Sequence, residues 1–477
     1  MTASPQPFQL PGYAVLAEQE LRFGAEDPRA VEAHPLEGLL RFGPYSRDKL
    51  AAIADPIRVA IIAPAGQVER VNGLLRELQQ SHQPRERRPY LRGFPGFSKV
   101  FHVNMGPAGP QANVELPGDL TEQIKRAEKP HLKLAEALQH ALRTLRHQRD
   151  AFDVVYILLD KAWEVGFFGG ETDDFNLHDY VKAIAAFEGI PTQFLNEDRS
   201  LAYHCRASVM WRLGIALYTK AGGVPWVLAN IDPGTAYIGI DYALRPNTDA
   251  DSRFAICCSQ VFDAEGSGLE FVAYEASGVR MFGKNPFLHR DQMMKVMSRS
   301  LAVYQRKHAG AVPSRIVVHK NTEFKPYEID GVFDAFPNTE NIELVHVQQN
   351  SGWKGVYIIK PQQPNGYPCL RGSTFQIGQH TSLLWTQGDL PVVSNNGKSY
   401  FKEGKGTPEP LILNRHAGRG SMDDLCKETL ALTKMDWNND GPYDRMPVTL
   451  NFAGTLASVV KQMPKLEPRS YPVRLFM

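Results

Sequence analysis

Two lysines, a histidine and a glutamine in the first half of the chain could together bind an anion. His178 and Lys182 are four residues apart, so on a helix they share one face. Gln193 lies at the start of a predicted strand after this helix, and Lys220 ends a second predicted helix. Lysine supplies a point charge with three donors, while histidine and glutamine supply directional hydrogen bonds. The set suits a terminal phosphate, although histidine and lysine at this spacing also occur on ordinary solvated helix faces.

These side chains depend on an alternation of short apolar strands with helices in residues 51–225. Leu177, Val181 and Ile184 form an apolar stripe, which predicts that helix 177–187 packs on a sheet. Such alternation is typical of a Rossmann-like α/β layer with parallel strands. The expected strands are 57–62, 154–159 and 192–195, with a further short apolar run at 99–103, and the expected helices are 68–80, 120–148, 177–187 and 208–220.

After Pro225 the pattern predicts an RNase H-like second domain over residues 226–477. Three strands in a meander are followed by alternating helices and strands, which is the element order of that fold. Residues 1–50 are rich in proline, glycine and charge and predict an extended lead-in that packs on this second domain. The expected strands are 237–242, 254–262, 269–274, 315–319 and 343–348, with more within 355–388, and the expected helices are 290–308, 422–433 and 451–462.

The composition argues for some classes of protein and against others. The 477 residues carry a net charge of only +1, so a nucleic-acid site would need its positive charge concentrated in a channel. Five cysteines without a C-x-x-C spacing argue against a disulfide framework and a zinc site. No signal-like start and no apolar run of about 18 residues is found, which predicts a cytoplasmic protein without a membrane partner.

Several segments, in order along the chain, resemble landmarks of the Argonaute family. The histidine–lysine pair, the glutamine and the lysine before two glycines resemble its MID domain, where such residues bind the 5′-phosphate of a guide strand. The resemblance thus assigns guide binding to His178, Lys182, Gln193 and Lys220. Two departures are His178, where tyrosine is commoner, and Ala216, one turn before Lys220. The matching segments are GLLRFGPY at 38–45, YTKAGGVPW at 218–226, YIGID at 237–241, SRIVVHKN at 314–321, LTKMDWNN at 432–439 and MPVTLNFAGTLA at 446–457.

The family's slicing site is expected to be incomplete. Active PIWI domains use a set of acidic residues, completed by aspartate or histidine, to hold two divalent metal ions. At the matching positions this chain retains Asp241 but has Gln292, Asn321 and Gly454. The resemblance therefore implies no catalytic residues and no cleavage. An active guide-directed endonuclease is the alternative, and it would require the acidic residues to align differently, for example with Asp291.

The chain end carries a second expectation from the same resemblance. In compact Piwi proteins the C-terminal carboxylate and the glutamine hold Mg²⁺ against the guide phosphate. Here Met477 and Gln193 would be the metal ligands, and Mg²⁺ the cofactor. The apolar tail 471–477 could fold inward. A frayed terminus is the alternative.

The length of the chain predicts a short prokaryotic Argonaute that consists of MID and PIWI domains. The resemblance implies a guide RNA, a target DNA and a partner chain with an APAZ region fused to a sirtuin-type or TIR-type NADase or a nuclease. Such a pair acts in prokaryotic antiviral defence. A small-molecule-binding Rossmann-like protein is a further alternative, but no G-x-G-x-x-G follows the first strand, since 63–66 reads APAG.

Overall fold

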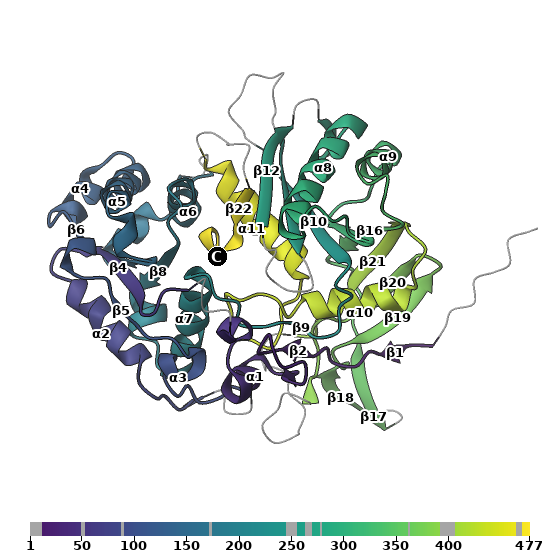
Figure 1. The fold of residues 1–477 in the computed structure, drawn as a ribbon, viewed down its shortest axis with the longest axis horizontal. Coiled ribbons are helices and arrows are strands. Elements are labelled where there is room, and N and C mark those ends of the chain that lie inside the picture. Colours follow the sequence, from purple (N-terminus) through teal and green to yellow (C-terminus); the bar gives the residue numbers. More distant parts are fainter. Residues whose placement is uncertain are drawn as a thin grey trace, which may run out of the picture. The chain divides into compact units, whose positions relative to one another are not determined.

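The chain forms two compact units, each assembled from segments that are distant in sequence (Figure 1). The parallel-sheet unit comprises 22–227, 437–440 and 455–477, and the mixed-sheet unit comprises 1–21, 228–436 and 441–454. The predicted lead-in 1–50 is thus divided between the two units. The domain boundaries at 50 and 225 remain predictions from the sequence. In the described part of the chain no helix combines the length and apolar character that a bilayer crossing requires. The computed structural model describes residues 12–48, 53–86, 90–170, 174–244, 255–262, 270–276, 279–360, 363–391, 406–463 and 470–477.

The parallel-sheet unit is built around two strands that are buried on both faces. Strand β4 (Ile57–Pro64) pairs in parallel with β7 (Val154–Leu159), and β7 pairs in parallel with β8 (Thr192–Asn196). At the other side of β4 lie β5 (Met105–Pro107) and β6 (Asn113–Leu116), also parallel. The β-branched runs reflect this double burial, because a parallel sheet is covered by helices on both faces. The predicted Rossmann-like layer is confirmed.

Helices cover both faces of this sheet (Figure 1). On one face, Ile62 and Ile157 pack against Leu134 and Leu138 in the core. Pro130 occupies the first turn of α5, where its missing N–H costs nothing, so the predicted helix 120–148 is in fact two helices. The apolar run at 99–103 lies partly in helix α3 and forms no strand. One face carries α4 (Leu120–Arg126), α5 (Pro130–Arg146) and α6 (Leu177–Phe187), and the other carries α2 (Val68–Leu78), α3 (Phe97–Phe101) and α7 (Arg206–Lys220).

The lead-in contains a helix that the sequence did not predict. Helix α1 (Pro35–Phe42) begins at a proline, and the His34 imidazole Nδ1 accepts a hydrogen bond from the Leu36 N–H at 3.2 Å. Leu36 and Leu39 are buried. A proline in the first turn, a capped N-terminus and one buried apolar stripe are sufficient for a short helix. The remaining short strands are β1 (Ala14–Val15), β2 (Leu21–Arg22), β3 (Val31–Glu32), β9 (Val227–Leu228) and β22 (Ser470–Pro472).

The mixed-sheet unit has the strand order of an RNase H-like fold. Strands β10 (Thr235–Leu244), β11 (Ala255–Phe262) and β12 (Glu270–Ala276) form an antiparallel meander. Strands β15 (Arg315–Lys320) and β16 (Asn341–Gln348) continue it in parallel with β10. Within the unit the order is β1-β19-β20-β21-β16-β15-β10-β11-β12, which confirms the prediction. The other strands are β19 (Ser373–Gly378), β20 (Thr381–Leu384), β21 (Leu411–Ala417) and the hairpins β13–β14 (Arg280–Phe282, Asn285–Phe287) and β17–β18 (Val356–Lys360, Gln363–Pro368).

Helices approach the two faces of this sheet differently. On one face, α8 (Arg290–Lys307) and the unpredicted α9 (Pro326–Ala335) bury apolar side chains against β10 and β15. On the other face the start of α11 (Val448–Lys461) comes so close that a Cβ at Gly239 would lie 2.0 Å from the Thr449 carbonyl oxygen. Only glycine allows this approach. Helix α10 (Met422–Leu432) completes the helices of this unit in the described residues.

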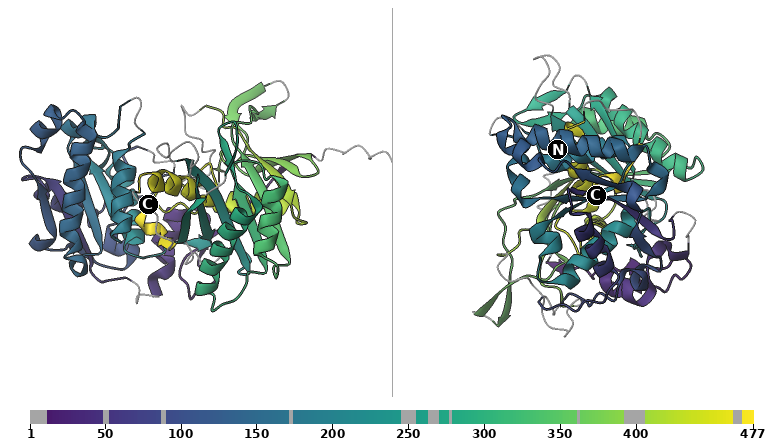
Figure 2. Two further views of the ribbon diagram at one scale, coloured as in Figure 1. Left: turned by 90° about the horizontal axis from the view of Figure 1, so that it is seen from above. Right: turned by 90° about the vertical axis from the view of Figure 1, so that its left-hand side faces the viewer.

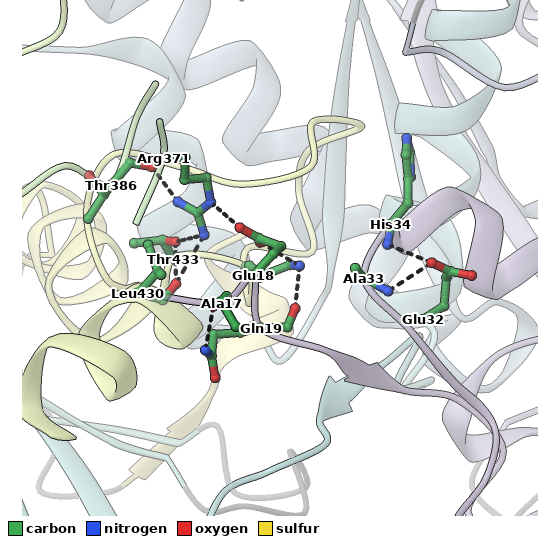
Figure 3. A network of polar contacts seen from close by, with 11 residues as sticks. Ala17, Glu18, Gln19, Glu32, Ala33, His34, Arg371, Thr386, Leu430 and Thr433 are labelled. Carbon is green, nitrogen blue, oxygen red and sulfur yellow. Dashed lines mark hydrogen bonds and ion pairs between the residues drawn. The ribbon is translucent and has the colours of Figure 1, made fainter. Parts of the chain in front are cut away.

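A buried ion network joins the N-terminal segment to the rest of the mixed-sheet unit (Figure 3). The Glu18 carboxylate lies 2.9 Å from the Arg371 Nε and 2.8 Å from the Lys434 Nζ. Arg371 also donates to the Leu430 carbonyl and to the Thr433 hydroxyl. Burial is the largest effect on Glu18 and raises its pKa, but the charges and hydrogen bonds of Arg371 and Lys434 together outweigh it and lower the pKa to about 2.

We expect Glu18→Gln to lower the free energy of unfolding by about 3–5 kcal/mol, because it leaves two buried cations without their carboxylate. The exposed neighbour Glu20 supplies the control, and Glu20→Gln should stay within about 0.5 kcal/mol of wild type. In wild type, the contribution of the lowered pKa is present above 4.5 and is lost as the pH falls through about 2. Urea unfolding of the three proteins measures both effects, and equal stabilities would contradict this assignment.

Candidate functional site

Helix α6 presents Lys182 to the interior of the parallel-sheet unit. The helix begins with Asn176, whose side chain accepts a hydrogen bond from the Asp179 N–H at 3.3 Å. Val181 and Ile184 pack in the core, and Lys182 is only 1 % exposed. The spacing of His178 and Lys182 resembled a solvated helix face, but the lysine is fully buried.

The amino group of Lys182 is held by main-chain oxygen atoms. Its Nζ donates to the Thr192 carbonyl at 2.6 Å and to the main-chain oxygen of Met477. Thr192 begins strand β8, so the hydrogen bond joins the helix to the adjacent strand. The sequence did not identify Thr192, because the contact uses its backbone rather than its side chain.

Lys220 lies at the end of α7 and is also 1 % exposed. Its Nζ donates to the Gln193 Oε1 at 2.5 Å, while the Gln193 Nε2 donates to the Phe194 carbonyl at 2.9 Å. Gly222, with φ of 109°, turns the chain away directly after the helix, as the two consecutive glycines at 222 and 223 predicted. The structure therefore brings Lys182, Gln193, Lys220 and Met477 together.

The C-terminal tail is folded into the parallel-sheet unit. Leu475, Phe476 and Met477 are buried, and the Phe476 ring contacts Tyr471 edge-on at 5.8 Å between centroids. The Met477 N–H donates to the Val473 carbonyl at 3.2 Å. The alternative of a frayed terminus is therefore wrong, and the Met477 oxygen is fixed beside Lys182.

His178 lies apart from this buried set. Its side chain is about half exposed, with Nδ1 at 3.0 Å from the Asp179 carboxylate. Its ring centroid lies 5.2 Å from that of Phe194 on β8, so the two rings form an aromatic surface. Phe194 was not predicted, although its place directly after Gln193 is a usable signal. Ala216 is buried and offers no polar group.

The electrostatics around Lys182 and Lys220 favour an anion. Burial is the main cause that lowers the pKa of Lys182 well below 10.5, and the positive charge of Lys220 lowers it further. Asp179 acts in the opposite direction. Two buried amines that oppose each other's protonation would both be stabilised in the charged form by a dianion such as a terminal phosphate. Strongly perturbed pKa values of this kind are concentrated at functional sites.

A second group of predicted residues lies at the carboxyl ends of β10 and β15 in the mixed-sheet unit. Asp241 follows Ile240, which pairs with Lys320, the last residue of β15, so Asn321 comes directly after the end of the adjacent strand. A Cβ at Gly454 would lie 3.1 Å from the Asp241 Oδ2. Burial raises the pKa of Asp241, and the hydrogen bond from the Tyr242 N–H opposes this shift. One carboxylate, one amide and one position without a side chain thus converge.

The fourth predicted position, Gln292, lies in the first turn of α8. Its Nε2 donates to the carboxylate of the neighbouring Asp291 at 3.0 Å on the exposed side of the helix. Asp291 itself is exposed and lies 3.9 Å from the Lys295 ammonium.

Comparison with known proteins places this geometry in context. No protein-family model matches the chain. The argonaute of Aquifex aeolicus is 21 % identical over 329 residues, which are 68 % of this chain and 41 % of that protein. The argonaute of Thermus thermophilus is 24 % identical over 292 residues, 59 % of this chain and 36 % of that protein. Among solved structures, Clostridium butyricum Argonaute with a guide DNA and a 19-mer target DNA has a TM-score of 0.69 at 14 % identity.

The chain has the fold of Argonaute proteins. The match to the Clostridium butyricum structure covers 98 % of this chain and 55 % of the other. The two units therefore correspond to a Rossmann-like MID domain and an RNase H-like PIWI domain. Figure 2 shows the parallel-sheet unit, coloured from purple to teal with its C-terminal segment in yellow, and the helices that surround its strands. The chain spans about two fifths of the length of the curated argonautes it matches.

The lowered pKa of Lys182 predicts a pH-dependent stability. Between the folded pKa and 10.5 the unfolded state binds more protons, so the free energy of unfolding rises with pH across this window. Lys182→Met removes this term, and the difference between wild type and variant should grow in favour of wild type as the pH rises. The control is Lys125→Met at an exposed lysine. Urea unfolding at several pH values checks this, and parallel pH profiles for wild type and Lys182→Met would refute it.

Proposed function

We propose that the chain binds the 5′-phosphate of a guide strand in the pocket of Lys182, Gln193 and Lys220. The supporting observation is the convergence of two fully buried lysines on main-chain and amide oxygens. A phosphate oxygen bound here would receive charge-assisted hydrogen bonds in a dry environment, where such bonds are strongest. The fold shared with Argonaute proteins supports a guide strand as the source of the phosphate.

His178 and Phe194, which form the aromatic surface, lie on α6 and β8, the same two elements that carry Lys182 and Gln193. A base stacks on aromatic rings with about 1–3 kcal/mol per base. We infer that the first base of the guide stacks on this surface, while its phosphate reaches Lys182 and Lys220. His178 then serves through its ring face rather than through a charge, consistent with its exposed position.

Lys182→Met and Lys220→Met should each weaken binding of a 5′-phosphorylated guide by about 1.5–3 kcal/mol, since each removes a hydrogen bond to a charged group. In the double variant, guides with a 5′-phosphate and a 5′-hydroxyl should bind equally. Fluorescence anisotropy with both oligonucleotides provides the measurement. The matched control is Lys161→Met, an exposed lysine of the same unit. Retained preference for the phosphate in the double variant would show that the pocket lies elsewhere.

The same pocket fits a Mg²⁺ ion bound with the phosphate. Gln193 Oε1 and the Met477 oxygen are hard oxygen donors, and both are held by lysine ammonium groups. Mg²⁺ favours a few protein oxygens together with phosphate oxygens and water. When bound, the ion would neutralise part of the phosphate charge. The residues of the chain position the donors and exclude solvent.

Extending the chain beyond Met477 with a short glycine–serine segment tests this metal proposal. The extension replaces the terminal carboxylate by a peptide carbonyl, so guide affinity should fall and lose its dependence on Mg²⁺. Affinities of both proteins are measured with Mg²⁺ and with EDTA. If EDTA does not change the guide affinity of the native chain, no metal ion takes part in guide binding. The proposal for Lys182 and Lys220 would then be unaffected.

We propose that the guided chain recognises a complementary strand without cutting it. Two divalent ions at short separation require several carboxylates to offset their charge. Around Asp241 the chain supplies the Asn321 amide and the bare Cα of Gly454. Base pairing would provide sequence specificity, while the protein contacts the backbone.

Single-turnover incubation with a fully paired target in Mg²⁺ or Mn²⁺ should therefore give no cleavage. Asn321→Asp alone should remain inactive, because Gly454 and Gln292 still add no charge. Denaturing gels resolve the target strand after incubation with excess guided protein. A cut opposite the centre of the guide that disappears in Asp241→Ala would establish the endonuclease alternative.

The proposed biological role combines guide binding with recognition of a target that the chain does not cut. We propose that the chain uses a guide RNA to detect a target DNA in prokaryotic defence, in the cytoplasm. Destruction would then be carried out by a partner chain with an APAZ region and an effector, a sirtuin-type or TIR-type NADase or a nuclease. Support comes from the sequence resemblance and from the match to curated argonautes.

A further inference from the structure

A polar cavity of about 540 Å³ opens in the mixed-sheet unit beside Asn321. It lies where the parallel strands β15 and β16 end, the edge at which open α/β sheets commonly bind ligands. Its volume falls in the range of small-molecule sites, about 300–1,000 Å³. The residues that carry the argument are Phe287, Asn321, Thr322, His346, Arg415 and His416.

Two polar atoms in the cavity wall have no protein partner. The Asn321 Oδ1 and the Thr322 Oγ1 are both shielded from solvent and receive no hydrogen bond. Buried polar groups in folded proteins are nearly always paired, so unpaired ones need an explanation. Both atoms belong to adjacent residues that line the same cavity, so its wall holds hydrogen-bonding capacity that no described protein group uses.

Two histidines of the cavity, His346 and His416, have pKa values below the usual value of a histidine. Burial and the nearby His416 lower the pKa of His346 to about 4, and burial also lowers the pKa of His416. Their ring centroids are 6.1 Å apart. A neutral imidazole donates one hydrogen bond and accepts another. His346 already forms a hydrogen bond with the Asn321 backbone, so the remaining donor and acceptor groups of the two rings are those that a ligand could use.

The charged groups of the cavity are already engaged within the protein. Glu323 forms an ion pair with Lys325. The Arg415 guanidinium donates to the Gly420 carbonyl and lies 3.0 Å from the His380 Nδ1. Recognition in this cavity thus depends on directional hydrogen bonds and aromatic surfaces, not on a net positive charge. That chemistry does not suit a phosphate.

We propose that this cavity binds a single nucleobase of a single-stranded nucleic acid. A base is planar and aromatic and carries donors and acceptors on its edge, which matches the neutral imidazoles, the Asn321 amide and the ring of Phe287. Proteins that bind unpaired bases combine stacking with hydrogen bonds to the base edges. The inference deepens the proposed function and rests on it, since it assigns a contact for a base of the complementary strand beside Asp241.

Titration of the guide-free protein with adenosine, guanosine, cytidine and thymidine tests the cavity directly. At least one nucleoside should give saturable signals in saturation-transfer NMR, and ribose 5-phosphate should neither bind nor compete. His346→Leu, His416→Leu and Thr322→Val should each weaken this binding about tenfold or more, the loss of one or two hydrogen bonds. His308→Leu, outside the lining, is the control and should bind as wild type does.

Guide affinity measured in the same variants separates the two proposals. It should be unchanged, because Lys182 and Lys220 belong to the other unit. Thermal melting checks that each variant is folded, and Thr322→Val retains the shape of the side chain if a histidine variant unfolds. The cavity proposal is overturned if no nucleoside binds saturably, if ribose 5-phosphate competes equally, or if all folded variants bind like wild type.

Discussion

The burial of two lysine amines in one pocket is the constraint on which this account depends. An ammonium group that leaves water loses several kcal/mol of hydration unless charge or hydrogen bonds replace it. Lys182 and Lys220 are each 1 % exposed, and each raises the cost of charging the other. We propose that binding a dianion offsets this cost.

The parallel sheet creates this pocket by bringing the ends of several elements together. The register between β7 and β8 fixes the positions of the Thr192 carbonyl and of Gln193 beside β7, a central strand of the core. The end of α7 places Lys220, and the apolar tail carries the Met477 oxygen to Lys182. Because each contact uses backbone or an element terminus, the pocket depends on the packing of the whole unit.

The sequence predicted the elements that have strong local signals. The bounds 177–187 and 154–159 match α6 and β7, since apolar periodicity and β-branched runs determine them locally. The parallel and RNase H-like arrangements followed from element order. Helices α1 and α9 were missed because short helices beside prolines have little periodicity.

The contacts within the site were harder to predict from the sequence than the residues that form it. Spacing identified Lys182, but only tertiary packing shows that it is buried rather than solvated. The Thr192 carbonyl and the Phe194 ring have no residue-type signal for their roles. Likewise, the proximity of Gly454 to Asp241 depends on helix α11 lying against the sheet, which the close approach at Gly239 permits.

The most direct test of the buried-lysine pocket is the number of protons taken up when a guide binds. Calorimetry at several pH values between about 8 and 10, in buffers of different ionisation enthalpy, measures this number, and in this range the 5′-phosphate is already a dianion, since its second pKa is about 6. The account predicts proton uptake with a 5′-phosphorylated guide, and none with a 5′-hydroxyl guide or in Lys182→Met. Equal proton uptake with both guides would contradict it.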